Sequence, residues 1–254
     1  MIVEVLLSCM HLDEDDKVME LVRRTNIRGK AVVVSQCNRN GSSQIGDVKI
    51  IYTNERGLSS SRNLAIANST ADICLLCDDD EILCDNYQEI IEKAYAENSS
   101  SDFICFYVYR PAKPCPQKQY RISRKTFWPI ASVEISFLRE KVKDKGIHFD
   151  TRLGSGVSCC GGEENKFIYD LINSKLSGIY IPKTIGRLIP SESPTWFKGF
   201  SCEYFKDRAN FSRILLGPVI GRIYSFYFLF SKRKLIKSAP ESISMIRALW
   251  IMIS

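Results

Sequence analysis

Short apolar segments alternate with segments of helical periodicity along the first 110 residues. The apolar segments are rich in Val, Ile and Tyr and end at turn-forming or charged residues, which is typical of buried strands. This pattern predicts strands at residues 2–7, 31–35, 48–52, 73–77 and 103–109, and helices at 15–25, 59–68 and 85–97. Such an alternation predicts an α/β fold whose mostly parallel central sheet is flanked by helices on both faces.

The alternation stops after residue 110. Residues 111–139 are interrupted by prolines and rich in aromatic and basic side chains, which suggests a hairpin or an insertion on the substrate side. A short helix at 140–145, a glycine-rich loop, a helix at 163–174 and a strand near Ile179 are predicted to follow. With 254 residues and 45% hydrophobic content, the chain can form one large α/β domain with a small appendage.

Four acidic residues, Asp78, Asp79, Asp80 and Glu81, follow the fourth predicted strand directly. Ligands of parallel α/β sheets bind at the carboxyl ends of the strands, so this run is expected in the binding cleft. Side chains alternate in extended chain, so we expect Asp78 and Asp80 to converge and Asp79 to point elsewhere. Two charges about 4 Å apart repel by about 4 kcal/mol at an effective dielectric of about 20, and a divalent cation would remove that repulsion. The alternative is a solvated acidic turn before the next helix.

The sequence around this run resembles a known family. The segment "NERGLSSSRNLAIANSTADICLLCDDDE" is similar, over residues 58–81, to the signature of family 2 glycosyltransferases, which carry the GT-A fold. "FDTRLGSG" followed by "GGEENKFIYDLI" resembles the acceptor-side segment of the same family. The resemblance covers most of residues 1–190. It implies a GT-A domain there, with a nucleotide-sugar-binding half at 1–110 and an acceptor half at 111–190.

The resemblance also implies a set of donor-side residues. In this family the first and last aspartates of the motif serve the nucleotide-sugar donor, one near the ribose and the other on a metal that bridges the diphosphate. Carried over, this makes Asp80 and Asp78 the metal ligands, for Mn2+ or Mg2+, with Asp79 as a further donor-binding residue. Ser8 and Gln36, at the ends of the first two predicted strands, occupy positions where the family binds the nucleobase.

Arg62 and Asn63 lie on the predicted helix before the aspartates, and the family signature makes both candidates for donor binding. Ser59 to Ser61 are candidates for the cap of that helix, whose N-terminus would face the cleft. An equally simple interpretation is that Arg62 pairs with a structural carboxylate.

Glycosyl transfer with inversion needs a base that takes the proton of the acceptor hydroxyl, and a carboxylate suffices. The family supplies this base from a Gly-Glu-Asp segment, which Glu163 and Glu164 match here with Glu in place of Asp. We expect Glu164 to be the base and Glu163 to support the acceptor side. Alternatively, both glutamates merely stabilise the first turn of a helix.

The ten cysteines are scattered, and several lie in predicted strands, where a free thiol packs as a small hydrophobic group. We expect reduced thiols in a cytosolic protein. Cys74 and Cys77 form a C-x-x-C pair, but strand alternation would place them on opposite faces, which excludes a shared zinc site. The chain opens with a short apolar run and no basic segment, which predicts a first strand and no signal peptide.

Residues 191–254 are predicted to form a basic, apolar, helical extension. Ten basic residues and three acidic ones follow Thr195, so this part carries a charge of +7. Because the net charge of the chain is +6, the first 195 residues carry about −1. The apolar run at 214–230 is short for a spanning helix, and the basic residues beside it favour a pair of interfacial helices on a membrane surface. The alternatives are a core helix and a homo-oligomer contact. Basic residues mixed with long apolar runs argue against nucleic-acid binding.

Together these features predict an enzyme that transfers a sugar from a nucleotide-sugar donor, a UDP-sugar first, to a glycan or lipid-linked saccharide in cell-surface polysaccharide synthesis. We expect it to be inverting and metal-dependent, and to work at the cytoplasmic face of the membrane. A sugar nucleotidyltransferase is an alternative, but it would need a glycine-rich N-terminal loop that "LLSCMHLDEDD" lacks. A catalytically silent scaffold with the same fold would not need its acidic residues.

Overall fold

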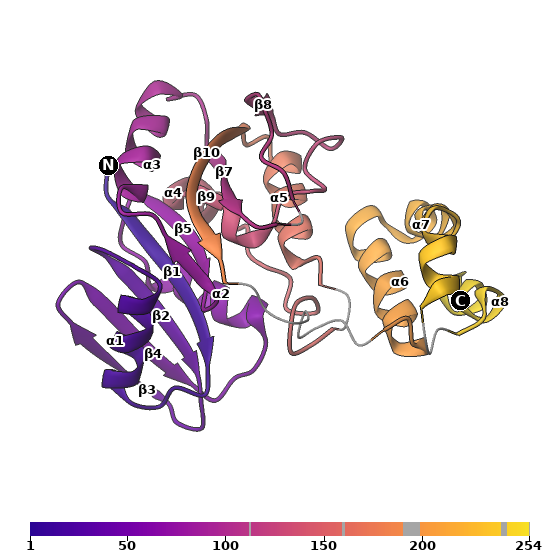
Figure 1. The fold of residues 1–254 in the computed structure, drawn as a ribbon, viewed down its shortest axis with the longest axis horizontal. Helices are drawn as coiled ribbons and strands as arrows, with labels where there is room; N and C mark the ends of the chain where they lie inside the picture. Colours follow the sequence, from indigo (N-terminus) through magenta and orange to yellow (C-terminus); the bar gives the residue numbers. More distant parts are fainter. Residues whose placement is uncertain (112, 159–160, 190–198, 240–242, 254) are drawn as a thin grey trace.

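The computed structural model describes residues 1–111, 113–158, 161–189, 199–239 and 243–253. Its strands form one sheet in the order β3-β4-β2-β1-β5-β9-β7-β10-β6, with β8 beside β10 (Figure 1). The strands are β1 (Val3–Met10), β2 (Ala31–Gln36), β3 (Gly41–Ile45), β4 (Val48–Thr53), β5 (Ile73–Asp78), β6 (Glu81–Leu83), β7 (Phe103–Tyr109), β8 (Tyr120–Arg121), β9 (Ile135–Leu138) and β10 (Gly178–Leu188). The helices are α1 (Asp15–Arg24), α2 (Leu58–Asn68), α3 (Tyr87–Glu97), α4 (Arg139–Asp144), α5 (Glu163–Asn173), α6 (Cys202–Leu216), α7 (Pro218–Ser238) and α8 (Met245–Ile253), with a 3-10 turn at Ser132–Glu134.

Parallel pairing sets the geometry of the N-terminal half. β1 pairs in parallel with β2 and β5, and β2 pairs in parallel with β4. The carboxyl ends of these four strands therefore meet at one edge of the sheet, where loops can build a binding site. The antiparallel strand β3 closes the outer side of β4.

The two faces of the sheet carry two separate hydrophobic layers. On one face, Leu21 of α1 and Ile91 of α3 pack against strand residues such as Val33. On the other, Ala65 of α2 and Phe167 of α5 pack against residues such as Val34. Neighbouring strand residues thus point to opposite layers, as side-chain alternation requires. The predicted α/β fold with helices on both faces is confirmed.

The same alternation separates the two thiols of the C-x-x-C pair. Cys74 belongs to one layer and Cys77 to the other, as predicted. The eight cysteines among the described residues are free, whereas Cys159 and Cys160 lie outside the part that the structure describes.

The sequence pattern missed β3 and β6, and it predicted only a hairpin or an insertion where β8 and β9 lie. β9 lies between β5 and β7 and runs antiparallel to both, inside the stretch expected to be a hairpin or an insertion. It has only four residues and includes Ser136, whose buried hydroxyl donates to the carbonyl of Ile104 (2.7 Å). That polar residue interrupts the apolar run on which the prediction depends. β3, "GSSQI", is an exposed edge strand with almost no hydrophobic signal.

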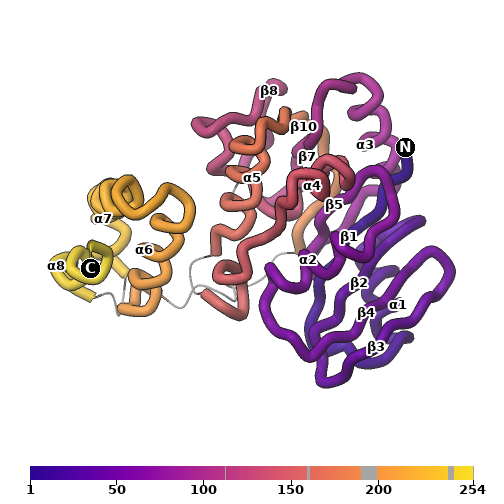
Figure 2. Tube along the Cα trace, turned by 180° about the vertical axis from the view of Figure 1, so that it is seen from behind, coloured from indigo at the N-terminus to yellow at the C-terminus, as the bar shows by residue number. Residues whose placement is uncertain are grey.

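The C-terminal helices α6, α7 and α8 form a bundle beside the α/β body, with α6 nearer to it and α8 farther away (Figures 1 and 2). The bundle packs on the body. Phe211 of α6 is buried against Gly162, where an added Cβ would lie 2.4 Å from its ring. Tyr224 of α7 stacks on Trp128 of the body with ring centroids 5.4 Å apart. The predicted domain boundary at residues 190 and 191 lies outside the described part of the chain.

The predicted apolar run at 214–230 spans the junction of two helices. Gly217 and Pro218 end α6 and begin α7, because Gly217 adopts φ of +80° and proline is favoured in a first helical turn. Among the described residues, no helix combines the length and the apolar character that crossing a bilayer requires.

Candidate functional site

A cavity of about 620 Å³ opens at the carboxyl ends of β1, β2 and β5. The strand register brings its polar residues together, because Ser8 lies opposite Asp78 and Met10 lies opposite Gln36. Its wall is formed by Ser8, Cys9, Met10, Gln36, Arg56, Gly57, Leu58, Asp78, Asp79, Asp80, Arg110, Ser155, Gly156 and Leu188. The sequence prediction that these strand ends form one cleft is confirmed by this lining.

All three aspartates of the acidic run line the cavity. β5 ends at Asp78, so Asp79 and Asp80 lie beyond the strand, and the direction of the Asp79 side chain stays a prediction. Burial and the charge of Asp78 raise the pKa of Asp79, and burial with the charges of both neighbours raises the pKa of Asp80. The site therefore concentrates negative charge on its own wall.

Glu81 does not join the aspartates or cap the following helix. It begins β6, is fully buried, and neither carboxyl oxygen has a hydrogen-bond partner within the described residues. Burial and the charge of Asp78 raise its pKa well above the usual range. The N-cap of α3 is Asn86 instead.

Arg62 is the charged residue at the centre of the site. Its side chain is 1% exposed and donates to Asp78 Oδ1 (2.8 Å) and to Glu163 Oε1 (2.9 Å). Burial lowers the pKa of Arg62, but the two carboxylates outweigh burial and raise it. Arg62 therefore joins the aspartate run to the start of α5 through two carboxylates that the sequence had assigned to the site, and its role toward a donor stays a prediction.

Ser59 and Asn63 of α2 hold a loop whose Ser155 and Gly156 line the cavity. Ser59 donates to the carbonyl of Leu153 (2.7 Å), and Asn63 both accepts from and donates to the backbone of Phe149 (2.7 and 2.8 Å). Asn63 therefore faces the loop and is absent from the cavity wall. The predicted serine cap is also wrong, since Gly57 is the N-cap and the three serines lie inside the helix.

Ser8 and Gln36 lie on the cavity wall, where the sequence placed them. The hydroxyl of Ser8 accepts a hydrogen bond from Ser61 (2.8 Å), and Gln36 Oε1 accepts one from the backbone N–H of Gly57 (2.7 Å). These bonds fix the start of α2 against the ends of β1 and β2. Their roles toward a nucleobase stay predictions.

Glu163 and Glu164 open α5 after Gly162, whose φ of +99° requires glycine. Glu163 is buried and paired with Arg62. Burial of its carboxyl group and the adjacent charge of Glu163 raise the pKa of Glu164 to about 8. Neither glutamate is part of the cavity wall, so their link to the cavity passes through Arg62 and Asp78.

Comparison of the sequence with models of known protein families identifies the family of this chain. The family model described as "Glycosyl transferase family 2" matches residues 26–158, more than half of the chain, and this range includes the strand ends and the aspartate run. The chain belongs to glycosyl transferase family 2. It is therefore a glycosyltransferase, and the resemblance drawn from its motifs is confirmed. No curated protein matches the sequence.

The fold of the transferase is also that of solved GT-A structures. S. aureus TarS 1-349 in complex with UDP-GlcNAc aligns with a TM-score of 0.65 at 12% identity, over 95% of this chain and 77% of that chain. The same fragment in complex with UDP gives a TM-score of 0.63 at 13% identity, over 95% and 76%. A further structure, of S. aureus TarS with a longer chain, gives a TM-score of 0.63 at 14% identity, over 96% of this chain and 46% of that chain. At these identities the likeness shows the fold.

Two arginines of the transferase's cavity were missed by the sequence analysis. Arg110 directly follows β7 and reaches the wall, where its Nη2 lies 3.2 Å from Glu134 Oε2. Arg56 precedes α2 and donates to the carbonyl of Cys37 (2.9 Å) and to Asn38 (2.8 Å). For Arg110 the available signal was a basic residue directly after a predicted strand, which is where the cleft of a parallel sheet lies.

The aspartates suit a divalent cation that also takes ligands from a substrate. Among the described residues, no three His, Cys, Asp or Glu side chains converge into a complete metal cage. Both oxygens of Asp78 are engaged, by Arg62 and by Ser132 (3.3 Å). Mg2+ is commonly held by one or two carboxylates with phosphate oxygens and water completing the shell, and hard cations prefer such oxygen ligands. The donor set on the wall fits that mode.

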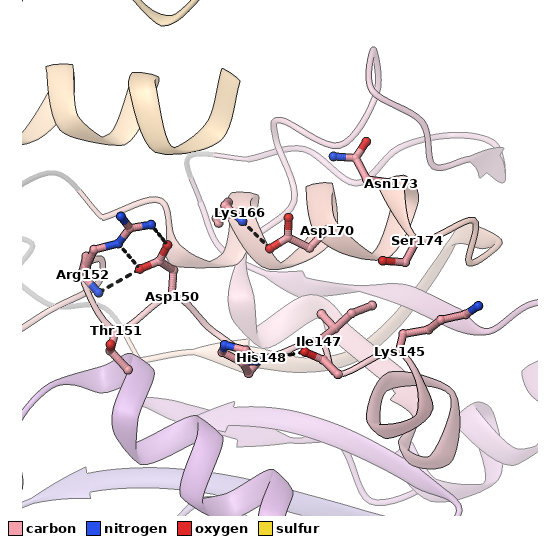
Figure 3. A pocket seen from close by; sticks show the side chains of 11 residues that line it. Lys145, Ile147, His148, Asp150, Thr151, Arg152, Lys166, Asp170, Asn173 and Ser174 are labelled. Carbon is pink, nitrogen blue, oxygen red and sulfur yellow. Dashed lines mark hydrogen bonds and ion pairs between the residues drawn. The ribbon is translucent and has the colours of Figure 1, made fainter. Parts of the chain in front are cut away.

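A second hollow of about 490 Å³ lies along α5 (Figure 3). Its charged residues are largely paired with one another, because Arg152 donates to Asp150 (2.6 Å) and Lys166 pairs with Asp170. None of the residues predicted for the site lines it. Its wall is formed by Lys145, Gly146, Ile147, His148, Asp150, Thr151, Arg152, Lys166, Asp170, Asn173 and Ser174.

Proposed function

We propose that this glycosyltransferase moves a sugar from a nucleoside-diphosphate donor, a UDP-sugar first, to a hydroxyl of a glycan or lipid-linked saccharide. The observation that carries the proposal is the cavity at the strand ends, which is lined by three aspartates and two arginines. A bound diphosphate is stabilised by positively charged groups such as the arginines, and the repulsion among the aspartates is relieved by a bound cation. TarS, which shares the fold, binds UDP-GlcNAc and UDP in its structures, and this supports a uracil nucleotide here.

The proposed metal is Mn2+ or Mg2+, with Asp80 and Asp78 as ligands and Asp79 beside them. When bound, it would neutralise charge on the diphosphate as the sugar departs. Arg110 and Arg56 would take the remaining phosphate charge. Ser8 and Gln36 would face the nucleoside, since they lie on the neighbouring strand ends.

Glu164 is the proposed base. The acceptor oxygen attacks the anomeric carbon as the bond from that carbon to the diphosphate oxygen breaks. Glu164 takes the hydroxyl proton and the nucleoside diphosphate leaves. Attack from the side opposite the leaving group inverts the anomeric centre. A pKa raised to about 8 makes Glu164 a stronger base than an ordinary carboxylate, and Arg62 keeps the neighbouring Glu163 paired. Asn63 acts here as a positioning residue, through the backbone of Phe149.

Thermal unfolding in the presence of nucleotides tests this function. UDP, GDP and CDP are added separately, each with Mn2+ and with a chelator, and the midpoint of unfolding is measured. A ligand that binds only the folded state raises the midpoint, because it stabilises that state by RT ln(1 + L/Kd), where L is the free ligand concentration. We expect that one nucleoside diphosphate, UDP in the first place, raises the unfolding midpoint, and that it does so only in the presence of metal. The same midpoint under all six conditions would contradict the proposal.

A further inference from the structure

One face of α7 is apolar and open to solvent. Val219, Ile223, Phe226 and Phe230 follow one another at separations of four, three and four residues, which places them on a single helix face. Ile220 and Tyr227 lie beside them. These six side chains are 50–67% exposed, although exposed apolar groups of a monomer are normally scattered singly. We call this set the α7 stripe.

The opposite face of α7 is fixed in the bundle. Phe228 and Leu229 are buried, and Gly221 touches α6 so closely that an added Cβ would lie 2.7 Å from the carbonyl oxygen of Ser212. α7 therefore cannot rotate its stripe inward without unpacking α6. Because the face opposite the stripe is packed against protein, α7 can lie along a surface with the stripe as its free face.

The spacing of the stripe continues into positive charge. Lys234 and Lys237 follow Phe230 at separations of four and three residues, so they prolong the same face, and Arg233 lies next to them. The sequence after Thr195 carries ten basic and three acidic residues, a charge of +7. An apolar stripe that ends in lysines matches a surface that offers both hydrocarbon and negative charge.

We propose that the α7 stripe docks this glycosyltransferase on an anionic lipid surface. The aromatic and aliphatic side chains enter the boundary between headgroups and acyl chains, and the basic end meets lipid phosphates and carboxylates. Charge distinguishes this occupant from a second copy of the chain, because two extensions of +7 would repel each other across a shared apolar face. The docking needs no assumption about the donor or acceptor of the enzyme.

Co-sedimentation with vesicles tests the proposal on the full chain. The wild type is expected to bind phosphatidylglycerol-containing vesicles more tightly than phosphatidylcholine vesicles, and to lose affinity as salt rises. The double variant Phe226→Ser/Phe230→Ser should weaken binding by about tenfold or more, because two large apolar side chains leave the interface. Leu235→Ser is the matched control, since Leu235 is exposed on α7 but outside the stripe, and it should bind within about twofold of wild type.

The charge contribution is tested separately by Lys234→Glu/Lys237→Glu, which should abolish the preference for anionic over neutral vesicles. Unfolding midpoints with and without nucleoside diphosphate confirm that each variant keeps its body and its ligand site. Equal binding of the stripe variant and wild type would overturn the proposal. So would a wild type that ignores vesicles and forms a dimer that the stripe variant cannot form.

Discussion

At the scale of single residues, the site depends on one buried arginine shared by two carboxylates. Arg62 lies between Asp78 at the end of β5 and Glu163 at the start of α5, so these two elements meet at its guanidinium group. Planar guanidinium suits this task because it can serve two carboxylates in fixed directions, which an ammonium group cannot. The arrangement leaves Glu164 as the acidic group of the pair with a raised pKa.

Replacing Arg62 by Met should destabilise the fold strongly. Removal of one partner of a buried ion pair leaves uncompensated charge and costs about 3–5 kcal/mol in the free energy of unfolding. Arg152→Met is the control, because its partner Asp150 is held by a largely exposed side chain, and surface pairs contribute about 0–1 kcal/mol. Urea unfolding measures both. Equal losses in the two variants would contradict a structural role for the Arg62 pair.

Glu164→Gln should keep donor binding and lose transfer. For wild type, the transfer rate should rise with pH through about 8, because only the ionised carboxyl accepts the proton. The pKa of Glu164 in the folded protein lies above the usual 4.5, so the fold favours the neutral carboxyl group. The free energy of unfolding therefore falls as pH rises from about 4.5 to about 8. Glu164→Gln should lose this pH dependence of stability. A pH–rate profile that is unchanged in Glu164→Gln would assign the base elsewhere.

Arg110→Ala should weaken binding of the nucleoside diphosphate by about tenfold, because a hydrogen bond to a charged group contributes about 1.5–3 kcal/mol. Calorimetric titration measures this affinity. Arg121→Ala is a matched control, since Arg121 is exposed on β8 and absent from the cavity wall. If both variants bind like wild type, Arg110 serves only its ion pair with Glu134.

At the scale of elements, the "GLSSSRN" segment holds two strands and a loop together by hydrogen bonds. Its residues bind β1 through Ser61, β2 through Gly57 and the 149–155 loop through Ser59 and Asn63. A motif that sequence reasoning associated with donor contact is thus used mainly for assembly of the cleft. Only Gly57 and Leu58 of this segment reach the cavity wall.

The elements also explain what the sequence could and could not predict. Strands β1, β2, β4, β5 and β7 were predictable because each is buried and strongly apolar. β9 was not, because its buried position depends on the side-chain hydrogen bonds of Ser136. Glu163, one of the two partners of Arg62, lies 101 residues away in the sequence, and no local pattern reveals such a contact.

At the scale of the whole molecule, a nearly neutral α/β body carries a basic helical bundle. The two share a hydrophobic cluster in which Phe205 and Phe211 of α6 join Phe167 of α5. The bundle thereby rests on the helix whose first turn contains Glu163 and Glu164. Packing of the C-terminal helices and the position of these two glutamates are linked through α5.

Phe211→Ala tests this link. Truncation of a fully buried phenylalanine should cost about 3–5 kcal/mol in the free energy of unfolding. Because Phe211 touches Gly162 at the start of α5, the variant should also lose transfer activity more than donor affinity. Phe230→Ala, on the exposed stripe of α7, should leave the stability within about 0.5 kcal/mol. Stability of Phe211→Ala equal to wild type would mean that the bundle does not rest on the body.

The central claim is that the aspartate run binds a metal and a nucleotide sugar, and one assay tests it most directly. Purified protein is incubated with a panel of nucleotide sugars, with Mn2+ or with a chelator, and released nucleoside diphosphate is measured for wild type and Asp80→Asn. We predict release from one donor, a UDP-sugar first, only with metal, and a loss of about a hundredfold or more in the variant. Release by Asp80→Asn at the wild-type rate, or no release by wild type from any donor, would contradict the account.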